Sequence, residues 1–276
     1  MNPIRFFLIP IFFILLFCSG DTEANPAKRT AKTPQRHSHI LKNLVTEDTI
    51  LPFTVPIIAL NTRGIHETFS NALLIDKEKG IFLANAHITD SGTFFEIITK
   101  TETCAAYTKK SWIDWNRDLA LFKTVRCGGI ASMKNARFST TRLRISQDIT
   151  FNGYTSEGFR KDGLEKVVPI RIKGAVENRE TGWGITLGSI VDILDLRIRI
   201  LEGKTVPVIK RHWLFEEYIL IRTLDGEPDF KKGLSASPAF LENGEIAGII
   251  SGAIAKKTLV VSARHIRQFL SLIPFE

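Results

Sequence analysis

The chain has 276 residues, of which 44% are hydrophobic and 24% charged, so it has the composition of a globular protein with one large domain or two small ones. Its net charge is +8, but Lys and Arg are spread along the chain and are not clustered with stacking aromatic residues. The charge therefore favours a mild attraction to acidic surfaces and gives no specific support for nucleic-acid binding.

Residues 1–20 have the pattern of an export signal peptide. Arg5 supplies the positive charge, residues 6–17 form an apolar core, and small residues follow it. The core is shorter than the roughly 20 apolar residues that a membrane span needs, so we expect cleavage after Gly20. Two alternatives stay open, lipidation of Cys18 and an uncleaved anchor, and either would attach the protein to a membrane. We therefore expect an exported protein that is periplasmic, secreted or associated with the cell envelope.

Residues 21–46 are polar and basic and show almost no apolar periodicity, which predicts a flexible tether. His37 and His39 lie in this stretch, where a solvated tail is a better interpretation than a metal site. We predict a folded domain over residues 47–276, with no metal and no cofactor.

From about residue 49 the pattern changes to short apolar runs separated by turns, which is typical of an all-β barrel or sandwich. Predicted strands cover residues 54–60, 71–75, 81–84, 94–99, 167–172, 194–200 and 218–222. Asn243-Gly244 predicts a hairpin turn. A helix over residues 262–273 closes the chain, because Ser262 can cap it and Pro274 ends it.

Cys104 and Cys127 are an even pair once Cys18 is lost or lipidated, and export would place them in an oxidising compartment. Their midpoint falls between Trp115 and Asn116, in a turn-like stretch, so the two cysteines would face each other across a hairpin. We predict a Cys104–Cys127 disulfide. The alternative is two unpaired buried thiols.

Three polar residues stand beside predicted strands in a pattern that indicates chemistry. His87 follows the apolar run 81–84, Asp118 opens the run 119–123, and Ser235 lies in a tight loop before the Asn243-Gly244 hairpin. An imidazole held at a strand end is a good general base. Taken singly, each has an ordinary structural interpretation: a packed core histidine, an aspartate accepting turn hydrogen bonds, and a loop serine.

Asn85-Ala86-His87, Asp118-Leu119-Ala120 and residues 233–238 (Gly-Leu-Ser-Ala-Ser-Pro), in this order, resemble the trypsin-like serine peptidases. The chain is most similar to the exported bacterial high-temperature-requirement branch, without its PDZ domain, over residues 50–272. The resemblance implies two six-stranded antiparallel β-barrels of the chymotrypsin type, the first at about 49–140 and the second at about 145–261.

The resemblance also implies a role for each matching residue. His87 would be the general base, Asp118 would hold its tautomer, and Ser235 would be the nucleophile that attacks protein or peptide substrates. The backbone N–H groups of Gly233 and Ser235 would form the oxyanion hole, where one lost donor typically costs about 3 kcal/mol of transition-state stabilisation.

Two departures from the family pattern leave alternatives open. Ala236-Ser237 stands where the family has a Gly-containing pair, and a methyl group at 236 is strained if its φ is positive. This favours a pseudoprotease, which keeps the fold and binds without cleaving. A basic surface-adhesion protein is a further alternative, but it leaves the ordered motifs unexplained. The long stretch between Asp118 and Ser235 predicts an extra hairpin within residues 174–215.

Primary specificity rests on the faintest signals. Asp229 precedes Ser235 by six residues, where trypsin-like members place an acid at the base of the pocket, and Ser251-Gly252 resembles the pocket wall. This resemblance implies cleavage after Arg or Lys. The alternative is that Asp229 is a solvated loop residue beside two lysines.

Overall fold

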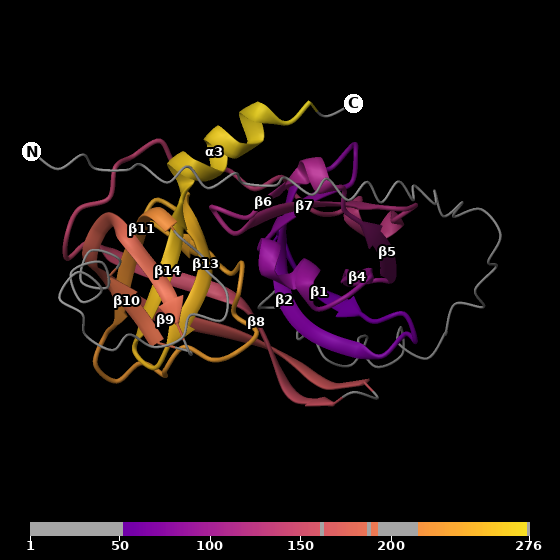
Figure 1. The fold of residues 1–276 in the computed structure, drawn as a ribbon, viewed down its shortest axis with the longest axis horizontal. Helices are drawn as coiled ribbons and strands as arrows, with labels where there is room; N and C mark the ends of the chain where they lie inside the picture. Colours follow the sequence, from indigo (N-terminus) through magenta and orange to yellow (C-terminus); the bar gives the residue numbers. More distant parts are fainter. Residues whose placement is uncertain (1–51, 161–162, 187–188, 193–214, 275–276) are drawn as a thin grey trace, which may run out of the picture. The chain divides into compact units, whose positions relative to one another are not determined.

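Two antiparallel β-sheets, each closed into a barrel, make up most of the computed structural model (Figure 1), which describes residues 52–160, 163–186, 189–192 and 215–274. These residues belong to one compact unit, Gln35–Glu276. Among them, no helix combines the length and the apolar character needed to cross a membrane. The predicted signal peptide (1–20), the tether (21–46) and the strand at 194–200 lie outside the described residues, as do Cys18, His37 and His39.

The first barrel is closed by pairing of its third and seventh strands. Six strands form the ring in the order β3-β2-β1-β4-β5-β7, and the two-residue strand β6 pairs with β7 outside it. The strands are β1 (Thr54–Leu60), β2 (His66–Asp76), β3 (Ile81–Ala84), β4 (Phe94–Ile98), β5 (Thr103–Tyr107), β6 (Ile113–Asp114) and β7 (Leu119–Thr124). Short 3-10 helices follow β3, β5 and β7: η3 (Ala86–Asp90), η4 (Lys110–Trp112) and η5 (Gly128–Ile130).

The second barrel has the same construction. Its ring runs β9-β11-β14-β13-β12-β8, closed by pairing of β8 with β9, and the short strand β10 pairs with β9 outside it. The strands are β8 (Asp148–Arg160), β9 (Gly163–Thr186), β10 (Ser189–Asp192), β11 (Phe215–Thr223), β12 (Pro238–Phe240), β13 (Ile246–Ile254) and β14 (Lys257–Ser262). The predicted fold of two six-stranded antiparallel barrels is therefore confirmed. The β9–β10 hairpin lies in the stretch where the sequence predicts an additional hairpin.

Local turn chemistry explains several of these connections. Gly244 adopts a φ of 80°, and its N–H donates to the carbonyl of Leu241 at 3.0 Å, which closes the predicted hairpin between β12 and β13. The chain ends in the helix α3 (Ala263–Leu272), whose N-cap Ser262 accepts a hydrogen bond from the N–H of His265 at 3.4 Å. The predicted C-terminal helix is thus present, and it packs on β13 and β14.

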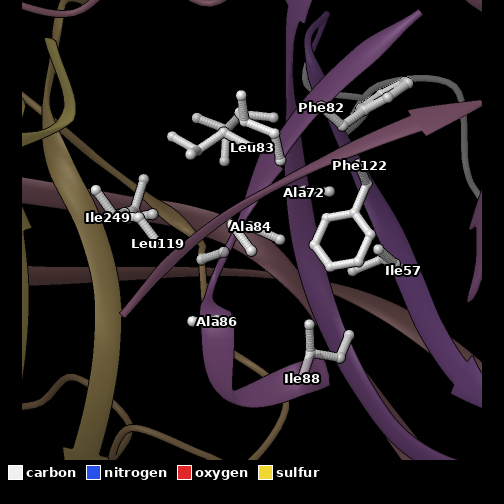
Figure 2. Close-up of a cluster of buried hydrophobic side chains, with 14 of the residues drawn as sticks. Ile57, Ala72, Phe82, Leu83, Ala84, Ala86, Ile88, Leu119, Phe122 and Ile249 are labelled. Carbon is white, nitrogen blue, oxygen red and sulfur yellow. The ribbon is translucent and has the colours of Figure 1, made fainter. Parts of the chain in front are cut away.

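One buried apolar cluster contains side chains from both barrels. Figure 2 shows Ile57 and Phe122 in the first barrel, and Leu119 of β7 beside Ile249 of β13. All four side chains are fully buried. Because burial of apolar surface is the main favourable contribution to folding, this shared cluster holds the strands of the two barrels together.

The predicted disulfide between Cys104 and Cys127 is present, with their Cα atoms 5.5 Å apart. The hairpin register differs by one residue from the one used to predict it, because Ala106 pairs with Thr124 and this register places residue 126 opposite Cys104. Arg126 has a φ of 50°, which ends the regular strand and brings Cys127 to its partner. The Glu102 carboxylate lies near both sulfurs, but bonded sulfurs are not the thiolates that bind metals.

Candidate active site

Pairing of β3 with β7 brings His87 and Asp118 together. Ala84 and Ala120 are partners in this pairing, so the residues just after β3 lie beside those just before β7. The side-chain amide of Asn85 donates to the backbone carbonyl of Asp118 at 3.1 Å, and the His87 N–H donates to Asp118 Oδ1 at 2.9 Å. Asp118 has a φ of 52°, a conformation that aspartate tolerates better than most residues.

A continuous set of hydrogen-bond distances runs from Asp118 through His87 to Ser235. His87 Nδ1 lies 2.8 Å from Asp118 Oδ2, and His87 Nε2 lies 3.2 Å from Ser235 Oγ. Asp118 is 1% exposed, while the His87 side chain is 31% exposed and so is accessible from solvent. A carboxylate bonded to Nδ1 favours the tautomer in which Nε2 is free to accept the serine proton.

The surroundings of His87 act on its pKa in opposite directions. Burial disfavours the charged imidazolium, but the negative charge of Asp118 and its hydrogen bond outweigh this effect, so the pKa of His87 is raised above its ordinary value. Nearby, burial and the charges of Asp118 and Asp114 raise the pKa of Tyr218 well above its ordinary value, which keeps this phenol neutral.

Ser235 lies in the loop between β11 and β12, where two backbone N–H groups have no partner among the residues that the structure describes. The Lys232 carbonyl accepts a hydrogen bond from Thr155 Oγ1 at 3.1 Å, and the carbonyl before Ser235 accepts from the Ser237 N–H at 3.0 Å. In a trans peptide the N–H points opposite to the C=O, so the N–H groups of Gly233 and Ser235 point away from these bonds. Neither N–H donates a hydrogen bond to any described residue. Two such donors beside a nucleophile can stabilise an oxyanion.

The residue after Ser235 is in a strained conformation. Ala236 is fully buried, its N–H donates to the Ile250 carbonyl at 2.7 Å, and its φ is 58°. A left-handed conformation costs an L-residue with a Cβ about 1–2 kcal/mol. Gly233 in the same loop has a φ of 92°, which glycine adopts freely. The methyl strain that the sequence suggests for Ala236 is therefore present, in a loop that still keeps Ser235 beside His87.

The three residues predicted to form a specificity pocket lie in different environments. Asp229 is exposed in the loop between β11 and β12. Ser251 is buried on β13, and its hydroxyl donates to Asp118 Oδ2 at 2.7 Å. The carbonyl of Gly252 accepts a hydrogen bond from Thr258. Sequence reasoning placed Ser251 at a pocket wall and missed this contact with Asp118.

Sequence reasoning also missed Asn71 and Thr155, which contact the Ser235 loop from β2 and β8. One signal was available for Asn71, because it is an amide at the start of an otherwise apolar predicted strand. A buried amide needs hydrogen-bond partners, so its position marks a polar contact inside the fold. No comparable signal marks Thr155, since threonine is common in strands.

The two six-stranded antiparallel barrels have the chymotrypsin-like fold of serine proteases. Within it, His87 and Asp118 come from the first barrel and Ser235 from the second. No protein-family model and no curated protein matches the sequence.

Solved structures do match. The active form of the Rv3671c protease from M. tuberculosis aligns with a TM-score of 0.55 at 16% identity, over 80% of each chain. Its inactive form aligns with a TM-score of 0.54, over 80% of this chain and 89% of the other. The serine endoprotease from Yersinia pestis gives 0.53 at 12% identity, over 82% of this chain and 64% of the other. At these identities the similarity establishes the fold.

Proposed function

We propose that this protein is an exported serine endopeptidase that cleaves peptide bonds through a Ser-His-Asp triad and an acyl-enzyme intermediate. The observation that carries the proposal is the set of contacts from Asp118 through His87 to Ser235, next to the N–H groups of Gly233 and Ser235, which bond to none of the described residues. The fold, which is that of serine proteases, agrees with this assignment.

In the proposed reaction, Ser235 Oγ attacks the carbonyl carbon of the scissile bond while His87 Nε2 takes the hydroxyl proton. The carbonyl oxygen becomes negative and accepts hydrogen bonds from the N–H groups of Gly233 and Ser235. His87 then gives its proton to the leaving amine, which departs and leaves the acyl-enzyme. Water, deprotonated by His87, hydrolyses the ester and restores the Ser235 hydroxyl. Asp118 stabilises the imidazolium in both halves, and Ser251 holds its carboxylate in place.

Export is the part of the proposal that rests mainly on the sequence. The signal-like residues 1–20 support it, and so does the Cys104–Cys127 disulfide, since such bonds persist in oxidising compartments. The expected substrates are proteins or peptides. Attachment to a membrane through lipidated Cys18 or an uncleaved signal remains part of the proposal.

A pseudoprotease is the second candidate, and Ala236 is the observation that favours it. A φ of 58° at a residue with a methyl group stores strain next to the nucleophile. If that strain is relieved by rearranging the loop, Ser235 would lose its contact with His87, and the protein would bind without cleaving.

Covalent labelling separates the two candidates. The purified mature protein and its Ser235→Ala variant are treated with a fluorophosphonate probe, which reacts with an activated serine. Labelling of the wild type that is lost in Ser235→Ala supports the peptidase. A folded wild-type protein that does not react would favour the pseudoprotease, and labelling restored by Ala236→Gly would identify the methyl group as the cause.

A further inference from the structure

We infer that Asn71 and Thr155 are positioning residues that hold the oxyanion hole open, and that Asn71 does so from the opposite barrel. The inference rests on the proposed function and adds the groups that keep the Ser235 loop in its productive conformation. Asn71 belongs to β2 of the first barrel, whereas the loop that it contacts belongs to the second.

Asn71 directs its whole side-chain amide and its backbone N–H at two segments of the second barrel. It is fully buried, and its Nδ2 lies 2.9 Å from the carbonyl oxygen of Gly233, 3.0 Å from that of Tyr154 and 3.2 Å from that of Ser235. Its Oδ1 accepts from the Tyr154 N–H at 2.8 Å, and its backbone N–H donates to the Ser235 carbonyl at 2.9 Å. An amide has only two N–H bonds, so the longest Nδ2 contact shares a hydrogen.

These contacts fix the peptide groups on both sides of Gly233. Thr155, which is 4% exposed, holds the carbonyl before Gly233, and Asn71 holds the carbonyl after it. Glycine would otherwise allow the peptide bond between Lys232 and Gly233 to turn over, because it populates positive and negative φ about equally. A turned peptide would aim the Lys232 carbonyl at the position of the oxyanion and remove one of the two donors.

The packing of β8 leaves the loop little room to move. Gly153 of β8 lies against Ser237, and a Cβ placed on Gly153 would collide with the Ser237 hydroxyl. Ser237 is fully buried. The loop is thus pressed against β8 on one side and bonded to β2 on another, and Asn71 stands where the two strands and the loop meet.

The test compares two positioning variants with a matched control on the same strand. Asn71→Ala removes the side-chain bonds without burying a charge, and Thr155→Val removes one hydroxyl at nearly constant shape. Ser70→Ala is the control. It removes the 3.0 Å hydrogen bond from the Ser70 hydroxyl to the Ser235 carbonyl, and that carbonyl still accepts a hydrogen bond from the Asn71 N–H. Each variant is assayed well below its melting temperature for kcat and KM, and for the Ki of a peptidyl trifluoromethyl ketone, whose adduct places an oxyanion in the hole.

If the inference holds, Asn71→Ala lowers kcat by about 100-fold, the scale of one lost oxyanion donor, with KM changed less than about threefold. The Ki of the ketone should rise in parallel, Thr155→Val should lower kcat by at least about tenfold, and Ser70→Ala should stay within about threefold. A purely structural role for Asn71 would lower the melting temperature and leave kcat unchanged, and that result would overturn the inference. If Asn71→Ala does not fold, an unchanged kcat in Thr155→Val overturns it.

Failure of the proposed function is recognised separately. A wild-type protein that does not react with the fluorophosphonate probe argues against the peptidase and leaves the loop question to a crystal structure of Thr155→Val. The inference then expects the peptide between Lys232 and Gly233 to be turned relative to its orientation in the wild type. The same orientation in both proteins would refute it.

Discussion

Replacing Ala236 by glycine should have almost no effect on stability, although a buried methyl group is lost. Removing the left-handed strain at a φ of 58° should stabilise the fold by about 1–2 kcal/mol. Against this, glycine adds freedom to the unfolded chain, which costs about 0.4–1 kcal/mol, and the lost burial costs about 0.8 kcal/mol. The opposing contributions nearly cancel, so the free energy of unfolding should change by less than about 1 kcal/mol.

Ala239→Gly is the matched control. Ala239 is also fully buried, three residues along in β12, and it is not among the described residues with positive φ. It therefore loses the same methyl group and gains the same unfolded-state freedom without relief of strain, at a cost of about 1.5 kcal/mol. In a domain of this size that lowers the melting temperature by about 3–6 °C.

Equilibrium urea unfolding of the wild type and both variants measures the difference directly, provided that the m-values agree. We expect Ala239→Gly to be less stable than Ala236→Gly by about 1–2 kcal/mol, which is the left-handed strain alone. Equal losses in the two variants would refute the reasoning, because they would mean that Ala236 is not strained in solution.

Three further predictions concern the site and its surroundings. Burial lowers the pKa of His87, but Asp118 raises it by more, so the net pKa is raised. As the pH decreases, kcat/KM should therefore fall with a midpoint above about pH 6.5. A midpoint below this value would contradict the reasoning. The double variant Cys104→Ser/Cys127→Ser, which opens a loop with a sequence separation of 23, should lose about 3 kcal/mol of unfolding free energy in urea. Because Asp229 is exposed, Asp229→Asn should change the ratio of cleavage after Arg to cleavage after Leu by less than about fivefold; a hundredfold loss would instead support the Arg-specific pocket.

The parts of the fold that follow from short-range chemistry could be predicted from the sequence. Asn243-Gly244 predicts a hairpin turn, and Ser262 and Pro274 mark the two ends of the last helix. These signals are readable because each residue affects only the backbone within a few positions of itself. The pairing of Cys104 with Cys127 was also predicted, although through a register that is wrong by one residue. The left-handed residue Arg126 shifts the end of the strand, and the sequence contains no signal that predicts its conformation.

The contacts that join distant segments could not be predicted in this way. The sequence motifs suggested Ser235 as a nucleophile, but the contact of Ser251 with Asp118 and that of Asn71 with Gly233 join residues more than 130 positions apart. The sequence left the sign of φ at Ala236 open, and only the loop geometry shows that it is positive. Such features depend on how the two barrels pack, which local patterns do not encode.

The bond from Asn71 across to Gly233 also links the proposed activity to the integrity of the first barrel. A molecule whose first barrel has opened loses His87 and Asp118 and, with Asn71, the order of the loop that carries the nucleophile. Opening of the first barrel therefore switches the proposed activity off in the same event that exposes its chain to digestion. Under the proposed function, opened molecules would be substrates for intact neighbours and could not attack them, so heat or acid would remove the least stable members of the population first.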